Sequence, residues 1–272
     1  LFTVVLEHFM TDTADHADYV LPATTQLEHL DVHGTYGHTD IMWNEPAVSP
    51  IGECKPNSQI FRELAARMGF TDPCFADDDE TLARQAFDWD AIGTSFDALR
   101  ERGWASLPIA DAPFAGGGFA TENGRAMVDV CGLGVPEHVP NHESVLSSPE
   151  LAARYPLAMI SPPARHFLNS TFVNVKSLRS IEGEPLLEIH ADDAMPRGIT
   201  DGAMVRVFND RGEYRCKAEV SSRARPGVVN GLGVWWRKLG ANGTNVNELT
   251  SQRLTDIGRA PTFYDCLVEV QR

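Results

Sequence analysis

The chain changes character near residue 155, and this change limits the folds open to it. Up to about residue 130, short apolar runs alternate with segments that carry helix caps, a pattern typical of α/β proteins. Beyond residue 155, short β runs are separated by Gly, Pro, Asn and Asp, which indicates a β-sandwich or β-barrel. The sequence therefore predicts an α/β part followed by a mostly β domain.

The local signals of the first part predict strands, capped helices and one hairpin. The strands are expected over 1–9 and 19–23, the helices over 11–18, 57–68, 77–87 and 95–103, and the hairpin over 116–130 with its turn at 122–125. The clearest helix is 57–68, which Asn57 or Ser58 should cap and Gly69 should end.

A stretch rich in Pro and Gly separates the two parts, which predicts a linker over 131–152 between residues 1–130 and 153–272. The strands expected after it are 155–160, 186–190, 202–209, 212–221, 227–236 and 266–271, with a short helix over 190–199.

Charge is spread unevenly along the chain. Residues 1–150 hold 7 Lys and Arg against 25 Asp and Glu, whereas residues 151–272 hold 16 against 13, which together give the net charge of −15. This asymmetry indicates two parts with different partners, although an acidic half can also be a merely soluble surface. A surplus of three positive charges over the second part is too small for binding duplex nucleic acid.

No apolar run approaches the ~20 residues that span a bilayer. The chain starts within an expected strand and without Met, so we expect that Leu1 is not the first residue of the gene product. A cytoplasmic location is expected, with the periplasm as the alternative.

The five cysteines are scattered and show no C-x-x-C spacing. This pattern argues against a zinc site, an iron–sulfur cluster or a disulfide framework within these residues, and most of the cysteines are expected to be reduced. They are Cys54, Cys74, Cys131, Cys216 and Cys266.

Three loops of the second part are unusually rich in amides and hydroxyls. They cover residues 161–174, 241–252 and 259–265. Amide side chains match the alternating donors and acceptors of a pterin or purine edge, and Arg and His suit a pyrophosphate. The alternative is that these residues simply form turns.

Histidines gather in the first part, at His29, His33 and His38, without a spacing that favours a metal site. We expect them to lie in a loop or a substrate channel. Glu28 beside His29 could form an acid–base pair, although nothing in their spacing requires it.

Several segments, in this order, resemble the molybdopterin oxidoreductases related to dimethyl sulfoxide reductase, nitrate reductase and formate dehydrogenase. The segments in the first part are FMTDTADHADYVLPATTQLEHLD, GTYGH, PIGECKPNSQIFRELAARMGF and GGFATENGRAMV. Those in the second part are SPPARHFLNSTF, HADDAMPRGITDGAMVRVFNDRGEYRCKAEVSSRARPGVV and NVNELTSQRLTDIGRAPTFYDCLVEV.

The resemblance implies a fold and a cofactor. Residues 153–272 would form a double-psi β-barrel that binds the molybdopterin dinucleotide, and residues 1–130 would be part of an α/β region with a partial Rossmann-like sheet. The cofactor would be bis(molybdopterin guanine dinucleotide) with molybdenum or tungsten, and the reaction a two-electron oxidation or reduction at the metal.

The resemblance also implies the cofactor-binding residues. These are Arg165, His166, Asn169 and Ser170 in the first loop, Asn247 in the second, Tyr264 in the third, and Asn57 and Glu7 in the first part. Asn57 stands where family members often have an aspartate that contacts guanine.

The family's metal ligand and any iron–sulfur motif lie nearer the N-terminus than these segments, so the catalytic residues and metal ligands are not assigned here. The expected partners are the cofactor, an N-terminal remainder of the same enzyme and an electron-transfer subunit. The alternatives are a free-standing module that binds a nucleotide or a protein without redox chemistry, and a structural subunit without cofactor.

Overall fold

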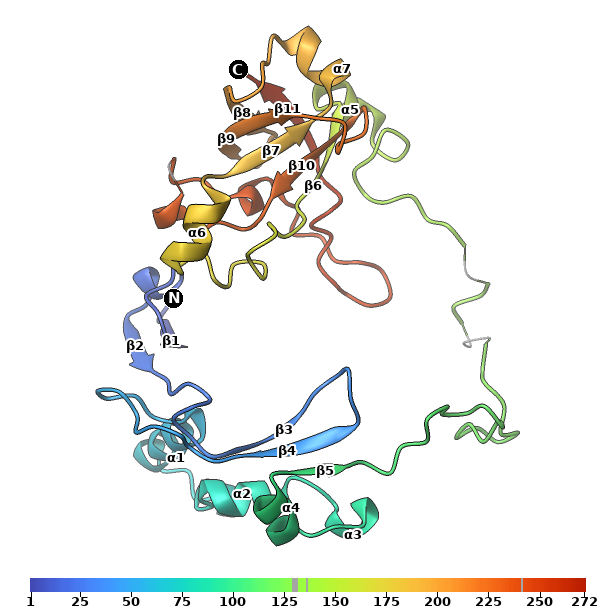
Figure 1. The fold of residues 1–272 in the computed structure, drawn as a ribbon. Helices are drawn as coiled ribbons and strands as arrows, with labels where there is room; N and C mark the ends of the chain where they lie inside the picture. The colour runs from blue at the N-terminus through green and yellow to red at the C-terminus, as the bar shows by residue number, and fades with distance from the viewer. Residues whose placement is uncertain (129–131, 136, 241) are drawn as a thin grey trace. The chain divides into compact units, whose positions relative to one another are not determined.

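The chain forms two compact units, Leu1–Val135 (unit 1) and Pro136–Arg272 (unit 2), which are treated separately below (Figure 1). The computed structural model describes residues 1–128, 132–135, 137–240 and 242–272. Cys131 and the last two residues of the predicted hairpin lie outside the described residues.

Unit 1 begins with two parallel strands, β1 (Val4–Glu7) and β2 (Tyr19–Pro22), where the sequence predicted strands. The predicted short helix between them is a 3-10 turn, η1 (Ala14–His16), and the backbone N–H of Ala14 donates to Thr11 Oγ1 at 3.2 Å. Because the chain returns through this short connection, the carboxyl ends of both strands lie at the same edge.

The next element is α1 (Asn57–Met68), which ends at Gly69 as predicted, with a φ of 75°. The predicted cap is wrong. Pro56 occupies the N-cap position, and the Ser58 hydroxyl donates to Asp79 Oδ1 at 2.6 Å rather than to the helix start. Pro56 has no N–H and starts the helix by its fixed φ, which the search for Ser and Asn caps missed.

The sequence analysis did not predict the antiparallel sheet of unit 1. It contains β3 (Asp31–Gly34), β4 (Asp40–Asn44) and β5 (Trp104–Ser106), in the order β3-β4-β5. Two predicted capped helices are present, α2 (Asp79–Gln85) and α4 (Phe96–Arg102), together with η2 (Pro73–Phe75) and a short unpredicted helix, α3 (Trp89–Ile92). Ile41, Phe96 and Leu99 are buried between the sheet and these helices.

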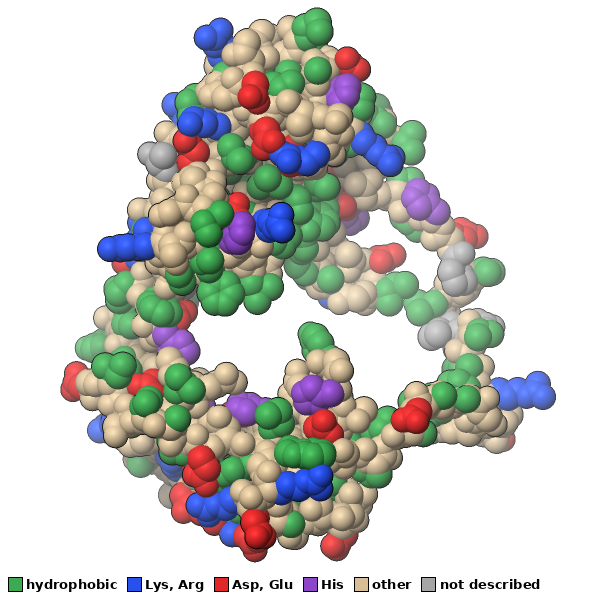
Figure 2. Space-filling model, in the orientation of Figure 1, with side chains coloured by type: hydrophobic (Ala, Val, Ile, Leu, Met, Phe, Trp, Pro, Cys, Tyr) green, Lys and Arg blue, Asp and Glu red, His purple; other side chains and the backbone are tan. Residues whose placement is uncertain are grey.

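Charged side chains surround the α2–α4 end of unit 1 (Figure 2). Arg84 bonds Glu80 at 2.8 Å and Asp97 at 2.9 Å, and Arg100 bonds Glu45 at 3.1 Å. Opposite charges are therefore interspersed on this acidic surface.

The predicted hairpin is wrong within its described residues, 116–128, which contain no strand. A turn does form near the predicted position, because the N–H groups of Gly118 and Phe119 both donate to the Gly124 carbonyl at 3.2 Å. Turn residues specify such a bend locally, whereas a hairpin also needs flanking strands that pair.

Unit 2 is a closed six-stranded barrel, which confirms the predicted barrel (Figure 1). The strands are β6 (Leu157–Ile160), β7 (Leu186–Ile189), β8 (Met204–Phe208), β9 (Glu213–Val220), β10 (Val228–Leu232) and β11 (Leu267–Gln271). The order around the barrel is β10-β6-β11-β8-β9-β7, with β7 and β10 closing it. The helical segments are α5 (Pro149–Arg154), α6 (Lys176–Glu182), α7 (Ala191–Ala194), η3 (Met195–Arg197), η4 (Arg237–Leu239) and η5 (Val246–Leu249).

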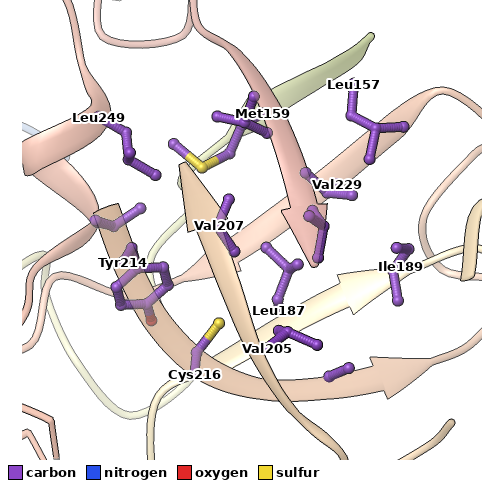
Figure 3. Packing of buried hydrophobic residues seen from close by; sticks show 14 of the residues in the cluster. Leu157, Met159, Leu187, Ile189, Val205, Val207, Tyr214, Cys216, Val229 and Leu249 are labelled. Atoms are coloured by element: carbon purple, nitrogen blue, oxygen red, sulfur yellow. The ribbon is translucent and has the colours of Figure 1, made fainter. Parts of the chain in front are cut away.

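The barrel interior is filled by apolar side chains from every strand (Figure 3). Met159, Leu187, Val207 and Val229 are fully buried in it, as is Tyr214 at 1% exposure. Alternate residues of each strand point inward, so short β runs of mixed polarity can supply this core. Among the described residues, no helix combines the length and apolarity that crossing a membrane requires.

Candidate functional site

Strand pairing brings three distant segments to one end of the barrel. β10 runs parallel to β6, so the chain leaves both strands at the same end. β11 runs antiparallel to β6, with Leu267 opposite Ala158, so the segment that enters β11 reaches that end as well. The loops that follow β6 and β10 and the segment that precedes β11 therefore meet there.

These segments enclose a cavity of about 590 Å³, within the range of small-molecule and cofactor sites. Most of its lining residues are uncharged and polar or aromatic. They are Ser161, Pro163, Asn169, Ser170, Val234, Asn247, Thr250, Ser251, Gln252, Arg253, Leu254, Pro261, Phe263 and Tyr264.

The loop after β6 is anchored by its apolar residues. Phe167 and Val173 are buried with Trp235, and the rings of Phe167 and Trp235 meet edge-to-face at 5.2 Å. Between these anchors, the residues at 168 and 171 exchange backbone hydrogen bonds of 3.2 and 2.9 Å, which closes a tight turn. Asn169 lies in this turn with a φ of 53°, a conformation that asparagine tolerates better than most residues. The anchors thus leave the polar residues of the turn at the surface.

Four predicted site residues line the cavity together: Asn169, Ser170, Asn247 and Tyr264. None of their side chains forms a hydrogen bond to any residue that the structure describes. Each amide offers two donors and an acceptor, and each hydroxyl offers one donor and an acceptor. A ligand with a rigid pattern of N–H and carbonyl groups, such as a pterin, fits this set of side chains.

Other polar residues of the same loops stabilise the fold. Asn245 caps η5, because its Oδ1 accepts from the N–H of Asn247 at 2.8 Å. Thr244 Oγ1 accepts from the N–H of Arg215 at 3.0 Å, and buried Thr262 donates to the Arg253 carbonyl at 2.9 Å. For these residues the turn and cap interpretation is the right one.

Arg165 and His166 lie in the loop after β6 but do not line the cavity. The Arg165 side chain is exposed and has no partner among the described residues. Glu182 Oε1 accepts from both the backbone N–H of His166, at 2.7 Å, and its ring Nδ1, at 2.6 Å. Because a carboxylate only accepts, the proton of the neutral ring lies on Nδ1, and Nε2 becomes an acceptor. His166 in this state suits an N–H or O–H donor better than a phosphate.

The predicted site residues of unit 1 lie at element ends. Asn57 is the exposed first residue of α1, and Glu7 is the half-buried last residue of β1. The Glu7 carboxylate accepts from the N–H of His8 at 2.7 Å, while the Asn57 side chain has no partner within the described chain.

The proposed acid–base pair of Glu28 and His29 does not form. The Glu28 carboxylate accepts from the N–H and the hydroxyl of Thr25, at 2.7 and 2.9 Å, and from the N–H of Ile51 at 2.8 Å. These bonds, those from Thr25 first, lower the pKa of Glu28, and His29 bonds instead to the Thr24 hydroxyl at 2.9 Å. Glu28 is thus a structural carboxylate, which adjacency in sequence did not reveal.

Sequence reasoning missed part of the cavity lining, namely Ser251, Gln252, Arg253 and Phe263. The signal available was the run TSQR directly after the η5 segment, with its polar residues at consecutive positions. In the described parts of the chain, no three His, Cys, Asp or Glu residues are grouped so that they could hold a metal ion.

Comparison with protein families identifies two matching stretches. Residues 1–67 match the molybdopterin oxidoreductase family, and residues 157–267, which include the barrel cavity, match the molydopterin dinucleotide binding domain. The dimethyl sulfoxide reductase DmsA of Escherichia coli is 27% identical over 99% of this chain and 37% of its own length. The chain belongs to the molybdopterin oxidoreductases of the dimethyl sulfoxide reductase family.

A further relative in this family is named probable oxidoreductase YoaE, from Bacillus subtilis, and is 36% identical over the whole chain and 40% of its own length. Acetylene hydratase from Pelobacter acetylenicus has a similar structure, with a TM-score of 0.80 over the whole chain and 40% of its own length, at 23% identity. The chain thus spans about two fifths of the length of these relatives.

Proposed function

We propose that this chain is the C-terminal, cofactor-binding part of an oxidoreductase that uses bis(molybdopterin guanine dinucleotide) with molybdenum or tungsten. The observation that carries this proposal is the barrel cavity, in which Asn169, Ser170, Asn247 and Tyr264 present unpaired polar groups. The cavity lies within the stretch that matches the dinucleotide-binding domain. When bound, such a cofactor supplies two-electron chemistry at its metal, while the protein supplies binding and orientation.

The residues of this chain would bind and orient the cofactor. The amides of Asn169 and Asn247 would match donors and acceptors on a ring edge, and the ring of Tyr264 would pack against a flat surface. His166, held by Glu182, would accept a hydrogen bond through Nε2. The exposed Arg165 would contribute a charge-assisted bond at the outer side of the loop.

Unit 1 would contribute the guanine contacts. Asn57 and Glu7 both carry side-chain oxygens that can accept from guanine N–H groups, and Glu7 ends a strand of a parallel pair, where α/β sheets bind nucleotides. We infer that the β1–β2 pair is a piece of a Rossmann-like sheet and that residues 1–130 form part of the catalytic region.

We also infer that unit 2 is a double-psi barrel, with residues 131–152 as its linker and residues 153–272 as the domain. Two parallel strand pairs, β6–β10 and β7–β9, within an otherwise antiparallel barrel support this description. The remaining partners would be the rest of a longer polypeptide and an electron-transfer subunit.

The test is cofactor retention by the full-length protein. Asn169→Ala and Asn247→Ala each remove a neutral hydrogen-bonding group worth about 0.5–1.5 kcal/mol, so the double variant should bind the cofactor roughly ten-fold more weakly. Pterin content and metal content are measured alongside thermal unfolding.

Asn242→Ala is the matched control, because Asn242 is an exposed amide of the same loop and does not line the cavity. It should retain wild-type pterin content. A wild-type protein without pterin, made in a host that produces the cofactor, would refute the proposed function.

A further inference from the structure

The cavity at the end of the barrel has a single charged lining residue among those that the structure describes. Of its fourteen lining residues, thirteen are uncharged and one is Arg253. A cavity of neutral donors and acceptors suits the ring system of a ligand. One guanidinium among them provides a place for one anionic group.

The backbone of Arg253 is fixed more firmly than its side chain. Its N–H donates to Ser251 Oγ at 3.1 Å, and its carbonyl accepts from the N–H and the hydroxyl of Thr262, at 3.3 and 2.9 Å. Its guanidinium makes one long contact, with Nη1 3.5 Å from His142 Nδ1. The side chain is therefore held at the cavity while most of its donors stay available.

Most other arginines of unit 2 are neutralised by a carboxylate. Such pairs are Arg154 with Asp210, Arg197 with Glu269, and Arg211 with Glu143. Within the described chain Arg253 has no carboxylate partner. Arg165 and Arg259 also lack one, but neither lines the cavity. Arg253 thus differs from both groups, because it is unneutralised and also lines the cavity.

We propose that Arg253 binds the diphosphate of a nucleotide ligand and makes the cavity select a nucleoside diphosphate over the corresponding nucleoside. The planar guanidinium fits two phosphate oxygens at once, which an amide or a hydroxyl does not. The inference rests on the proposed function and names the residue through which that site recognises the charged part of its ligand.

The test uses the full-length protein prepared without cofactor, with GDP and guanosine as probes in titration calorimetry. Wild type should bind GDP about ten- to a hundred-fold more tightly than guanosine, the range expected for a hydrogen bond to a charged group. Arg253→Gln should reduce this preference to within about three-fold and leave guanosine affinity unchanged. Arg253→Lys should keep part of the preference, because the charge remains and the fork is lost.

Arg259→Gln is the matched control. It makes the same change of charge at an exposed arginine that lies outside the cavity, and it should bind both probes as wild type does. Thermal unfolding of each variant shows whether the fold is kept.

Three results would overturn the inference: GDP binding by Arg253→Gln equal to that of wild type, an equal loss in Arg259→Gln, or no GDP preference in wild type. These results are distinct from failure of the proposed function, which would appear as absence of pterin from wild-type protein made in a cofactor-producing host. If pterin is present and Arg253→Gln retains full GDP binding, only the role of Arg253 is wrong.

Discussion

Asn245 and Asn247 stand two residues apart in one loop and have different roles. Asn245 forms a capping box with Glu248, whose Oε1 accepts from its N–H at 3.0 Å, and its Nδ2 donates to the Trp235 carbonyl. The Asn247 side chain has no partner within the described chain and lines the cavity. The same side chain therefore stabilises the fold at one position and is available to a ligand at the other.

This difference predicts opposite effects of two alanine substitutions. Asn245→Ala should lower the free energy of unfolding by about 1 kcal/mol, because a helix cap is lost. Asn247→Ala should change it by less than about 0.5 kcal/mol while it reduces pterin content. Denaturant unfolding of both variants checks this expectation, and equal destabilisation by the two would contradict it.

Glu28 makes stability depend on acidic pH. Its three hydrogen bonds lower its pKa from the usual 4.5, with those from Thr25 contributing most. A carboxylate with a lowered pKa in the folded state stabilises that state above the unfolded pKa, and this stabilisation is lost as pH falls through the folded pKa.

Glu28→Gln should therefore be less stable than wild type at pH 7, and the gap between their melting temperatures should shrink below about pH 4.5. Thermal unfolding between pH 7 and pH 3 measures the gap. A gap that stays constant across this range would show that the carboxylate charge has no such role.

At the scale of elements, the loop after β6 depends on a close approach to the end of β10. Gly233 has a φ of 76°, and a Cβ at this position would lie 3.1 Å from Cβ of Ala164. Ala164 belongs to the cluster that also buries Phe167 and Trp235. A side chain at residue 233 would therefore push on the loop that carries Asn169.

Gly233→Ala should destabilise the protein through its positive φ, by about 1–2 kcal/mol, and should also displace the loop and reduce pterin content. Gly227→Ala is the control, because Gly227 has a φ of 80° but nothing within 4 Å of an added Cβ. Both variants carry the same backbone strain, so only Gly233→Ala should lose cofactor beyond its loss of stability. Equal pterin content in the two would argue against the loop contact.

At the scale of the whole molecule, the two units differ in how fully their sheets are paired. The barrel of unit 2 is closed and has no free strand edge, and its interior strands bury residues such as Leu187 and Val229 completely. In unit 1, β1 and β2 form a parallel pair of only two strands, next to Phe2 and Tyr19 at 71% and 61% exposure. Parallel sheets are normally covered on both faces, so unit 1 should depend more on contacts outside itself.

We expect a fragment of residues 137–272 to unfold cooperatively on its own and a fragment of residues 1–135 to do so weakly or not at all. The reason is that the barrel pairs its own backbone and fills its own core, whereas the parallel pair does neither. Circular dichroism during thermal unfolding distinguishes the two outcomes. A sharp transition in the first-part fragment alone would contradict the expectation.

Features decided within a few residues could be predicted from the sequence by itself. Asp78 and Ser95 cap α2 and α4 by accepting backbone N–H groups three residues ahead, and Gly69 ends α1 in the left-handed conformation. Strand runs in the second part alternate between core and surface, which predicted a barrel or sandwich. The amide-rich loops also stood out, so the sequence indicated the kind of ligand that the second part suits.

Only the tertiary structure decided which strands are neighbours and which loop residues are free. β6 pairs with β10 and β11, strands that lie far from it in sequence, and local patterns carry no information about such pairing. That pairing brings Asn169, Asn247 and Arg253 to one cavity. Whether an asparagine serves a cap or faces a ligand depends on the partners that the completed fold supplies, since the side chain can satisfy either role.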